Sequence, residues 1–396
     1  MLRLAYFVSH PIQYQAPLLR LLAAEPEIDL TVFFYSDFSL KAYQDEGFGR
    51  LIEWDVPLTD GYKYQFLNCW GSNNQQDVAQ KSLAKDILQQ LKAGQFDAIW
   101  VHGWSWLCSI QAIQAANKLG IPVLLRGEAN GLNNSTNPLK KIAKTVFLEW
   151  LFQKVSGFLN IGTLNRQFYN EYGIADHRLF CVPYAVDNDY FQKLATLARH
   201  KREELRRSLN LEPDRPIILY AAKLIDVKRP HDLLAAYRLL STDGVQEPEP
   251  YLLFVGDGVL RPDLEAAAKE TGWDSIRFLG FRNQSQMPAM YDLCDVFVLP
   301  SGFEPWGLAI NEVMNAGKPV VVSDRVGCAP DLVKEQQNGQ IYPVGDIAAL
   351  ADSIRWAIAN HATAGDCSLK IIQNWSYQED IQGLKQALNY LQVKVA

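Results

Sequence analysis

Two glutamates bracket a short stretch whose residue types suit a ligand that carries both phosphate and hydroxyl groups. Glu304 lies in an expected loop that contains glycine and proline, and Glu312 lies about two turns along the expected helix. A loop that ends at a helix N-terminus offers unpaired N–H groups and the positive end of the helix dipole, which attract phosphate. A carboxylate instead accepts hydrogen bonds from hydroxyl groups. The pair therefore indicates a ligand such as a nucleotide sugar; the alternative is that both glutamates are solvated surface residues.

The residues around the two glutamates favour the first interpretation. Seven residues separate Glu304 from Glu312, glycine and phenylalanine precede them, and an Ala-Gly-Lys-Pro-Val run at 316–320 follows. This pattern resembles the donor-site signature of the retaining glycosyltransferases of the GT-B fold, family 4 in particular (glycosyl transferases group 1). The resemblance implies that Glu304 binds hydroxyls of the donor sugar and that Glu312 binds the ribose. It also implies donor contacts from the neighbouring residues Gly302, Phe303, Trp306, Gly307 and Leu308.

Two lysines extend the resemblance to the loop after the expected strand 216–222. Family members carry an Arg and a Lys there that contact the donor diphosphate, and Lys223 and Lys228 hold those two positions. Lysine keeps the positive charge of arginine but lacks its bidentate fork. The resemblance implies that both lysines, with the loop amides near Gly307, stabilise the leaving diphosphate without a metal ion. The alternative is a pair of solvated loop lysines.

Two further turns of the second half also match the family. Gly256-Asp257-Gly258 lacks the third glycine and the downstream acid of a dinucleotide-binding fingerprint, which disfavours a nicotinamide-dependent dehydrogenase. The resemblance instead implies donor contacts from Gly256 and, at the next strand end, from Phe281 and Arg282.

The pair Asp187-x-Asp189 has a spacing that binds metal ions in other glycosyltransferases. It lies in an expected linker without further ligands nearby, so no metal site is predicted.

Polar side chains also follow several expected strands of the N-terminal half. His10, His102, Arg126 and Glu128 lie at or just after strand ends, where parallel sheets bind ligands. The family resemblance is only partial here. Many members have a Gly-Gly turn where this chain has Ser9-His10-Pro11, and a histidine where it has Arg126. His102 is a candidate catalytic residue in place of that histidine; the alternative is a hydrogen-bonded core histidine.

The alternation of strands and helices predicts an α/β protein with parallel sheets covered on both faces. Strands are expected at 4–8, 29–35, 98–101, 122–125, 158–161 and 179–182 in the first half, and a chain of 396 residues should form more than one domain. The resemblance implies two Rossmann-like domains that face each other across a cleft. The first is an acceptor-binding domain at 1–188, and the second is a nucleotide-sugar-binding domain at 189–376. A C-terminal helix at 377–396 returns to the first domain.

Composition excludes several other classes of protein. The net charge of −6 disfavours a nucleic-acid-binding protein. The six scattered cysteines form no Cys-x-x-Cys pair, which favours reduced thiols in the cytoplasm and disfavours a zinc site. The N-terminal apolar run is too short for a signal peptide, and no run approaches the roughly 20 apolar residues of a membrane span. A cytoplasmic location is therefore expected.

The segment 137–152 is expected to form an amphipathic helix that opens at Asn137 and Pro138. Leu139, Ile142 and Val146 lie on its apolar face, and three lysines at 140, 141 and 144 cluster near its start. It could cover the sheet with a solvated lysine edge. It could also contact anionic lipid at the inner face of a membrane, where each basic residue contributes roughly 1 kcal/mol.

Taken with the resemblance, these features predict a metal-independent, retaining hexosyltransferase. It would move a sugar from a UDP-, GDP- or ADP-sugar, without another cofactor, to a sugar, lipid-linked or other acceptor in bacterial polysaccharide, glycolipid or other glycoconjugate synthesis. The family picture is attack on the same face of the sugar, with the leaving phosphate taking the acceptor proton and no covalent nucleophile. The Glu304/Glu312 spacing disfavours a phosphorylase and an inverting transferase. The alternative from another class is a non-catalytic protein that binds nucleotide sugars.

Overall fold

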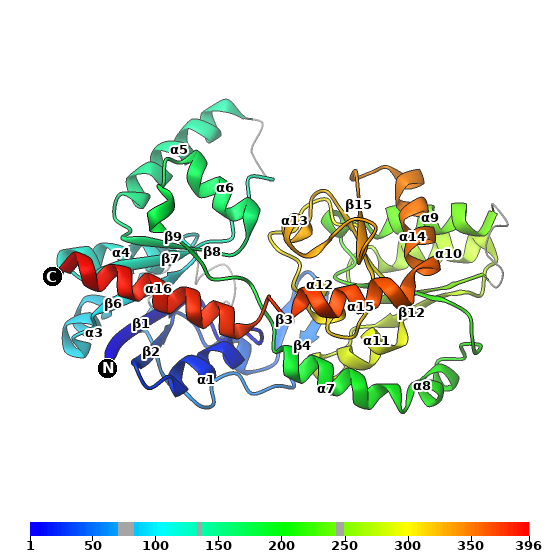
Figure 1. Cartoon of the computed structure of the whole chain (residues 1–396), viewed down its shortest axis with the longest axis horizontal. Coiled ribbons are helices and arrows are strands. Elements are labelled where there is room, and N and C mark those ends of the chain that lie inside the picture. Colours follow the sequence, from blue (N-terminus) through cyan, green and yellow to red (C-terminus); the bar gives the residue numbers. More distant parts are fainter. Residues whose placement is uncertain (70–82, 133–136, 243–248, 396) are drawn as a thin grey trace. The chain divides into compact units, whose positions relative to one another are not determined.

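The computed structural model describes residues 1–69, 83–132, 137–242 and 249–395, and the chain divides into two compact units (Figure 1). Unit 1 comprises Met1–Tyr43, Val56–Tyr184 and Tyr377–Ala396, and unit 2 comprises Gln44–Asp55 and Ala185–Ser376. The sequence predicted residues 44–55 within the first domain, whereas here they pack with unit 2. Asp45, Phe48 and Arg50 hold this segment there, because they contact Lys223, Phe281 and Asp257.

Unit 1 is built on a parallel sheet with the strand order β5-β2-β1-β6-β7-β8-β9. Its strands are β1 (Leu2–Val8), β2 (Ile28–Phe34), β5 (Lys63–Phe66), β6 (Ala98–His102), β7 (Val123–Arg126), β8 (Gly157–Asn160) and β9 (Leu179–Cys181). The inner strands β6, β7 and β8 are buried along their whole length, as strands covered on both faces must be. The strand order reverses between β1 and β6, so a ligand is expected beyond the carboxyl ends of these two strands.

Helices complete unit 1 and bury its core. They are α1 (Ala16–Ala24), η1 (Phe38–Leu40), α3 (Ile87–Gly94), α4 (Leu107–Lys118), α5 (Pro138–Phe152), α6 (Thr163–Glu171), η2 (Asp176–Arg178) and α16 (Tyr377–Val395). The terminal helix α16 packs on β8 and β9, which confirms its predicted return to the first sheet (Figure 1). A Cβ atom at Gly383 would lie 1.8 Å from the carbonyl oxygen of Cys181, so only glycine permits this close approach.

Unit 2 contains a second parallel sheet with the order β12-β11-β10-β13-β14-β15. Its strands are β10 (Ile217–Ala221), β11 (Tyr251–Val255), β12 (Ile276–Gly280), β13 (Val296–Leu299), β14 (Val320–Ser323) and β15 (Gly339–Tyr342). Here the order reverses between β10 and β13. The loops after these two strands carry Lys228 and Glu304, so the predicted donor residues lie at the position where such sheets bind ligands.

The helices of unit 2 are α7 (Asn188–Arg199), α8 (Arg202–Ser208), η3 (Asp226–Lys228), α9 (Pro230–Thr242), α10 (Arg261–Thr271), η4 (Gln284–Gln286), α11 (Met287–Leu293), α12 (Leu308–Met314), α13 (Ala329–Leu332), α14 (Ile347–Ala359) and α15 (His361–Ile372). A small sheet pairs β3 (Tyr43–Asp45) with β4 (Arg50–Ile52). Both large sheets are parallel and Rossmann-like, as the sequence predicted. Within the part of the chain that the structure describes, no helix has the length and apolarity to cross a membrane.

Candidate functional site

The loop between β13 and α12 is held in place by backbone hydrogen bonds on two sides. The Gly302 amide donates to the Val227 carbonyl at 2.7 Å. The Glu304 amide donates to the Arg325 carbonyl, and the Gly327 amide donates to the Glu304 carbonyl, each at 3.0 Å. The main chain at Glu304 is therefore fixed between two other loops, and its side chain has a defined direction.

The side chain of Glu304 forms an ion pair with Lys228, whose ammonium donates to Oε2. Both side chains are mostly buried, at 17% and 18% exposure. Lys228 ends η3, and the next residue, Arg229, has a positive φ of 49° that turns the chain into α9. The structure thus brings together the predicted phosphate-binding lysine and the predicted sugar-binding glutamate. Each could exchange its partner for a ligand of matching charge or hydrogen bonding.

Glu312 has a different environment from Glu304. The hydroxyl of Tyr291 in α11 donates to its Oε2 at 2.5 Å. Burial raises the pKa of Glu312 to about 7, and the hydrogen bond from Tyr291 only partly opposes this shift. At neutral pH this carboxyl therefore lies near the midpoint of its titration, and a ligand that donates hydrogen bonds to it would favour the ionised form.

The remaining predicted donor residues of this loop differ in how far they are buried. Trp306 is only 3% exposed, and its indole N–H donates to Asn311 Oδ1 at 2.9 Å. Its side chain thus belongs to the core and does not face a ligand. Gly307 has a φ of 102° at the N-cap of α12, a conformation that favours glycine. Gly302, Phe303 and Leu308 are partly exposed.

Lys223 is paired with an acid that sequence reasoning did not identify. Its ammonium donates to both oxygens of Asp45, at 2.8 and 3.0 Å, and lies 4.8 Å from the centre of the Phe48 ring. Both partners come from the segment 44–55 of unit 2. A diphosphate at Lys223 would have to compete with, or share the lysine with, the buried Asp45 carboxylate.

The turn after β11 approaches the loop of Lys223 closely. A Cβ atom at Gly256, whose φ is 132°, would lie 2.0 Å from the Ala222 carbonyl oxygen, so the turn requires glycine. At the end of β12, Phe281 packs against Phe48 at 5.0 Å and beneath the Arg50 guanidinium at 5.3 Å. The neighbouring Arg282 is partly exposed. Gly256 thus lies against the start of the Lys223 loop, and Phe281 packs on Phe48, which contacts Lys223.

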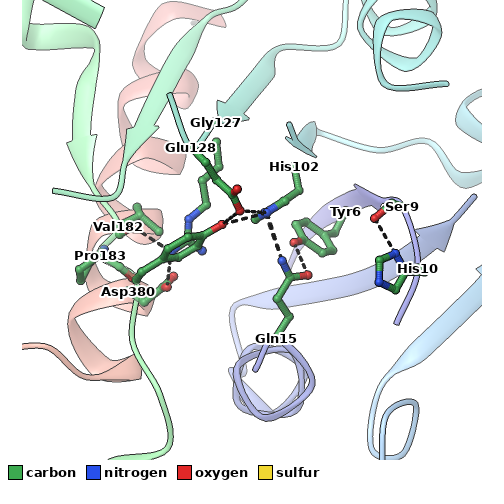
Figure 2. A network of polar contacts seen from close by, with 12 residues as sticks. Tyr6, Ser9, His10, Gln15, His102, Gly127, Glu128, Val182, Pro183 and Asp380 are labelled. Atoms are coloured by element: carbon green, nitrogen blue, oxygen red, sulfur yellow. Dashed lines mark hydrogen bonds and ion pairs between the residues drawn. The ribbon is translucent and has the colours of Figure 1, made fainter. Parts of the chain in front are cut away.

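In unit 1, His102 at the end of β6 is the centre of a polar network (Figure 2). Nε2 of Gln15 lies 3.2 Å from Nε2 and 3.4 Å from Nδ1 of the ring, and the Tyr184 hydroxyl lies 3.2 Å from Nε2. That hydroxyl donates to Glu128, whose Oε1 lies 3.6 Å from His102 Nε2. Tyr6 donates to Gln15 at 2.9 Å and completes the network from β1.

The charges in this network follow from burial and neighbours. Burial lowers the pKa of His102, although hydrogen bonding to Glu128 acts in the opposite direction, so the ring is neutral at pH 7. Burial tends to raise the pKa of Glu128, but the hydrogen bonds with His102 and Tyr184 and the charge of Arg126 hold it below its usual range. Glu128 is therefore an ionised carboxylate, and its side chain is 41% exposed. It is the group of the network that a ligand can reach.

Arg126 is buried and helps to hold the fold together, in contrast to the more exposed Glu128. It is 2% exposed and donates to the carbonyl oxygens of Val182 and Pro183, at 3.0 and 2.8 Å, and to Asp380 of α16 at 3.2 Å. Burial lowers the pKa of Arg126, but the charge of Asp380 outweighs that effect and raises it overall. Burial raises the pKa of Asp380 to about 6. Arg126 thus joins β7, the segment after β9 and the returning helix.

Two other polar residues named in the sequence analysis, His10 and Asp187, contact neighbouring groups of the fold. His10 Nδ1 lies 2.9 Å from Ser9 Oγ, and the ring packs on Phe38 at 4.1 Å. Burial, with the nearby His102, lowers the pKa of His10 to about 3. Asp187 caps α7 by accepting from the Tyr190 amide at 2.9 Å. Among the described residues, no group of three or more His, Cys, Asp or Glu side chains could hold a metal ion.

Sequence reasoning missed Asp45, Tyr291 and Tyr184 as partners of the predicted site residues. Sequence reasoning placed Glu128 near a strand end but did not choose it as a site residue. In the structure, His102 and Arg126 are opposite each other at the ends of β6 and β7, which brings Glu128 close to His102. The register of β6 and β7 could have indicated Glu128, because it follows Arg126 by two positions. No comparable signal marks Asp45, whose segment has no helix or strand periodicity.

Comparisons with known proteins give a family match for part of the chain and several relatives. Residues 201–373 match the sequence model of the family described as glycosyl transferases group 1. Sulfoquinovosyl transferase SQD2 of Arabidopsis thaliana is 31% identical over 182 residues, which are 45% of this chain and 32% of that protein. The 2-deoxystreptamine glucosyltransferase of Streptomyces kanamyceticus is 28% identical over 272 residues, 65% of this chain and 67% of that protein. With three other alignments to curated relatives, SQD2 among them, the chain spans less than half of the relative's length.

Solved structures show the same fold over the whole chain. HepE of Anabaena in complex with UDP has a TM-score of 0.72 and is 17% identical, with 98% of this chain and 100% of that chain covered. The α,α-trehalose 6-phosphate synthase of Burkholderia multivorans has a TM-score of 0.73 and is 15% identical, with both chains fully covered. These likenesses confirm the predicted GT-B fold. The family match covers residues 201–373, which lie in unit 2.

Proposed function

We propose that this protein is a retaining hexosyltransferase that moves a sugar from a nucleoside-diphosphate sugar to an acceptor in bacterial polysaccharide, glycolipid or other glycoconjugate synthesis. The observation that carries the proposal is the Lys228–Glu304 ion pair at the point where the strand order of the second sheet reverses. The family match spans both residues. Further support is that Anabaena HepE, which shares the fold, has been solved with UDP and with UDP-glucose.

Each residue of the pair has a proposed part in the reaction. Lys228, with Lys223, neutralises the diphosphate as negative charge builds up on the leaving oxygen. Glu304 accepts hydrogen bonds from hydroxyls of the transferred sugar and gains attraction as positive charge develops at the anomeric carbon. The bond from that carbon to the diphosphate oxygen breaks, a bond to the acceptor oxygen forms on the same face, and the acceptor proton passes to the leaving phosphate.

Nucleotide recognition is proposed to rest on Glu312, which would accept from the ribose hydroxyls, and on the strand end at Phe281 and Arg282. The donor is a UDP-, GDP- or ADP-sugar. A screen of these donors for thermal stabilisation identifies the base, because a ligand at 100 times its Kd stabilises the folded state by about 2.7 kcal/mol.

The acceptor is proposed to bind unit 1, where the exposed carboxylate of Glu128 can accept a hydrogen bond from an acceptor hydroxyl. Neutral His102 and Tyr184 hold that carboxylate in position. The acceptor is a sugar, a lipid-linked sugar or another hydroxyl compound. The protein would act in the cytoplasm, with peripheral contact to the inner face of a membrane.

The test is transfer itself. We expect release of nucleoside diphosphate from one of the three donor classes in the presence of an acceptor, with an anomeric configuration in the product, read by NMR, that matches the donor. Because lysines supply the positive charge, EDTA should leave turnover unchanged. A strict requirement for Mn²⁺ or Mg²⁺ would contradict this mechanism. Tight donor binding without hydrolysis or transfer would instead indicate a non-catalytic nucleotide-sugar-binding protein.

A further inference from the structure

Helix α5 carries an apolar stripe on the side that faces away from the core of unit 1. The stripe consists of Leu139, Ile142, Val146 and Trp150, which are 75%, 61%, 60% and 38% exposed. Their spacing of three or four positions places them on one face of a helix with 3.6 residues per turn. The side chains that α5 buries, Leu148, Leu151 and Phe152, lie on the opposite face near its carboxyl end.

The exposed stripe belongs to a well-formed helix. The side chain of Asn137 caps α5 by accepting from the amides of Leu139 at 3.0 Å and Lys140 at 3.3 Å, and Pro138 occupies the first helical position. Every residue from 137 to 143 is nevertheless exposed. The amino-terminal half of α5 therefore projects from unit 1 (Figure 1), although folding alone gives no reason to display apolar side chains there.

The charge around the stripe is positive. Residues 137–154 contain four lysines, at 140, 141, 144 and 154, and one acid, Glu149, which gives +3 in a chain whose net charge is −6. Lys140 and Lys141 are exposed in the first turns of the helix, on the side away from the stripe. At the other end, the ammonium of Lys154 lies 5.0 Å from the centre of the Trp150 ring. Apolar residues on one face, lysines on the other face and a tryptophan at the end are typical of helices that lie in a lipid–water interface.

The positive charge favours a lipid surface over a second copy of this chain as the occupant of the stripe. Two copies that met through the stripe would gain nothing from the lysines, which lie on the other side of each helix. A negatively charged lipid surface would instead accept the apolar side chains and attract the lysines.

We propose that the exposed stripe of α5, with Lys140 and Lys141, binds the surface of a membrane that contains anionic lipid. This inference gives the proposed peripheral membrane contact a surface and a lipid chemistry, but it does not rest on glycosyl transfer. The lysines would be attracted to the lipid headgroups, and Leu139, Ile142 and Val146 would enter the boundary between headgroups and acyl chains.

The experiment is sedimentation of the full chain with vesicles, in the absence of donor. We expect binding to vesicles of phosphatidylcholine mixed with phosphatidylglycerol, and weaker binding to phosphatidylcholine alone or at high salt. The double variant Ile142→Glu, Val146→Glu should lose about tenfold or more of the binding to both kinds of vesicle, because it removes apolar side chains that would enter the lipid. Lys140→Ala with Lys141→Ala should lose about tenfold, and only with the anionic vesicles.

Matched controls come from exposed residues elsewhere. Leu51→Glu replaces an apolar residue that is 61% exposed in unit 2, and Lys92→Ala with Lys118→Ala removes two exposed lysines of α3 and α4. Both controls should bind vesicles as the wild type does. Wild-type protein that sediments no better with anionic vesicles than without lipid would overturn the proposal. A wild-type dimer that Ile142→Glu converts to a monomer would also overturn it, since the stripe would then serve self-association. Donor hydrolysis by the same variants separates either outcome from failure of the catalytic proposal.

Discussion

The two units hold their predicted reactive groups in different ways. In unit 2, Lys228 forms an ion pair with Glu304 and Lys223 forms one with Asp45, and each lysine keeps some exposure. In unit 1, His102 is 9% exposed and lies among Gln15, Glu128 and Tyr184, which come from separate segments of the chain. A ligand in unit 2 has to exchange the acidic partners of these lysines. A ligand in unit 1 meets a network that is already complete except at Glu128.

This difference indicates different costs for the same kind of substitution. Buried groups that satisfy one another across segments contribute chiefly to the folded state, because losing one leaves another desolvated and unpaired. The Lys228–Glu304 pair, at 18% and 17% exposure, is less deeply buried than Arg126 and Asp380, and its position at a strand end favours a role in binding or catalysis. Substitutions in the unit 1 network should therefore affect stability first, and those in the unit 2 pair should affect activity first.

The largest expected effect is the loss of the Arg126–Asp380 ion pair. Asp380→Ala leaves the 2%-exposed Arg126 without its counter-charge, and such a change costs about 3–5 kcal/mol. Thermal and urea unfolding of the variant should show early melting of the transition that belongs to unit 1. Lys385→Ala on the same helix is the control, because Lys385 pairs with Glu25 at the surface and its loss should change unfolding very little. Equal stability of the two variants would show that the buried Arg126–Asp380 pair does not stabilise unit 1.

The second effect concerns activity in unit 2. Lys228→Ala removes a charge that is proposed to meet the diphosphate, and rate losses of roughly 10²-fold or more follow from deleting one preorganised electrostatic group. Both kcat and KM for the donor should suffer, and the loss of stability should be smaller than that of Asp380→Ala, because the pair is less deeply buried. Lys193→Ala, which removes an exposed lysine of α7, is the matched control. A Lys228→Ala enzyme with wild-type kinetics would show that the loop assignment is wrong.

The third prediction separates the two glutamates. Glu304→Gln should lower kcat about tenfold to hundredfold with little change in the affinity for free nucleoside diphosphate, since its contact strengthens as the anomeric carbon becomes cationic. Glu312→Gln should weaken that affinity by about tenfold, because it removes a charged hydrogen-bond acceptor. Calorimetric titration alongside steady-state kinetics measures both quantities. The reverse pattern would mean that the proposed orientation of the donor is wrong.

The same contrast explains what the sequence could predict. The unit 2 loops follow apolar strands, and their glycines and acids lie a few residues apart, so the sheet and the positions of Lys228 and Glu304 were predictable. The returning helix at 377–395 was predictable as well. The partners of those residues were not, because Asp45 lies 178 positions before Lys223, and Tyr291 lies 21 positions before Glu312. The unit 1 network likewise depends on sheet register and on Tyr184, neither of which leaves a local pattern.

The segment 36–66 shows this limit most clearly. It has no extended apolar periodicity, yet it contains β3, β4 and β5, and residues 44–55 pack with the second sheet. Its strands are three or four residues long, and all four residues of β5 are exposed. Such short strands form because a neighbouring strand or loop offers unpaired backbone groups, and this information lies elsewhere in the chain.

The smallest effect is a pH dependence that should mark Glu312 alone. Burial raises the pKa of Glu312 to about 7, and ribose hydroxyls would donate to its ionised form, so binding below pH 7 has to include deprotonation. The affinity for nucleoside diphosphate should therefore rise by up to about tenfold between pH 6 and pH 8. The ligand phosphate also titrates near the lower end of this range. The informative quantity is thus the difference between the wild type and Glu312→Gln, in which the contribution of this carboxyl is absent.

Stability supplies the independent check on the same carboxyl. A group whose pKa is raised on folding contributes stability that is present below its unfolded pKa, here the ordinary 4.5, and is lost as the pH rises through the folded value of about 7. Glu312→Gln should therefore lose less stability than the wild type between pH 4.5 and pH 8. Parallel pH profiles of affinity and of stability in the two proteins would show that the carboxyl titrates near its ordinary value. Tyr291 would then hold an ionised Glu312 from pH 6 to pH 8, and the ribose contact would gain nothing from a rise in pH over that range.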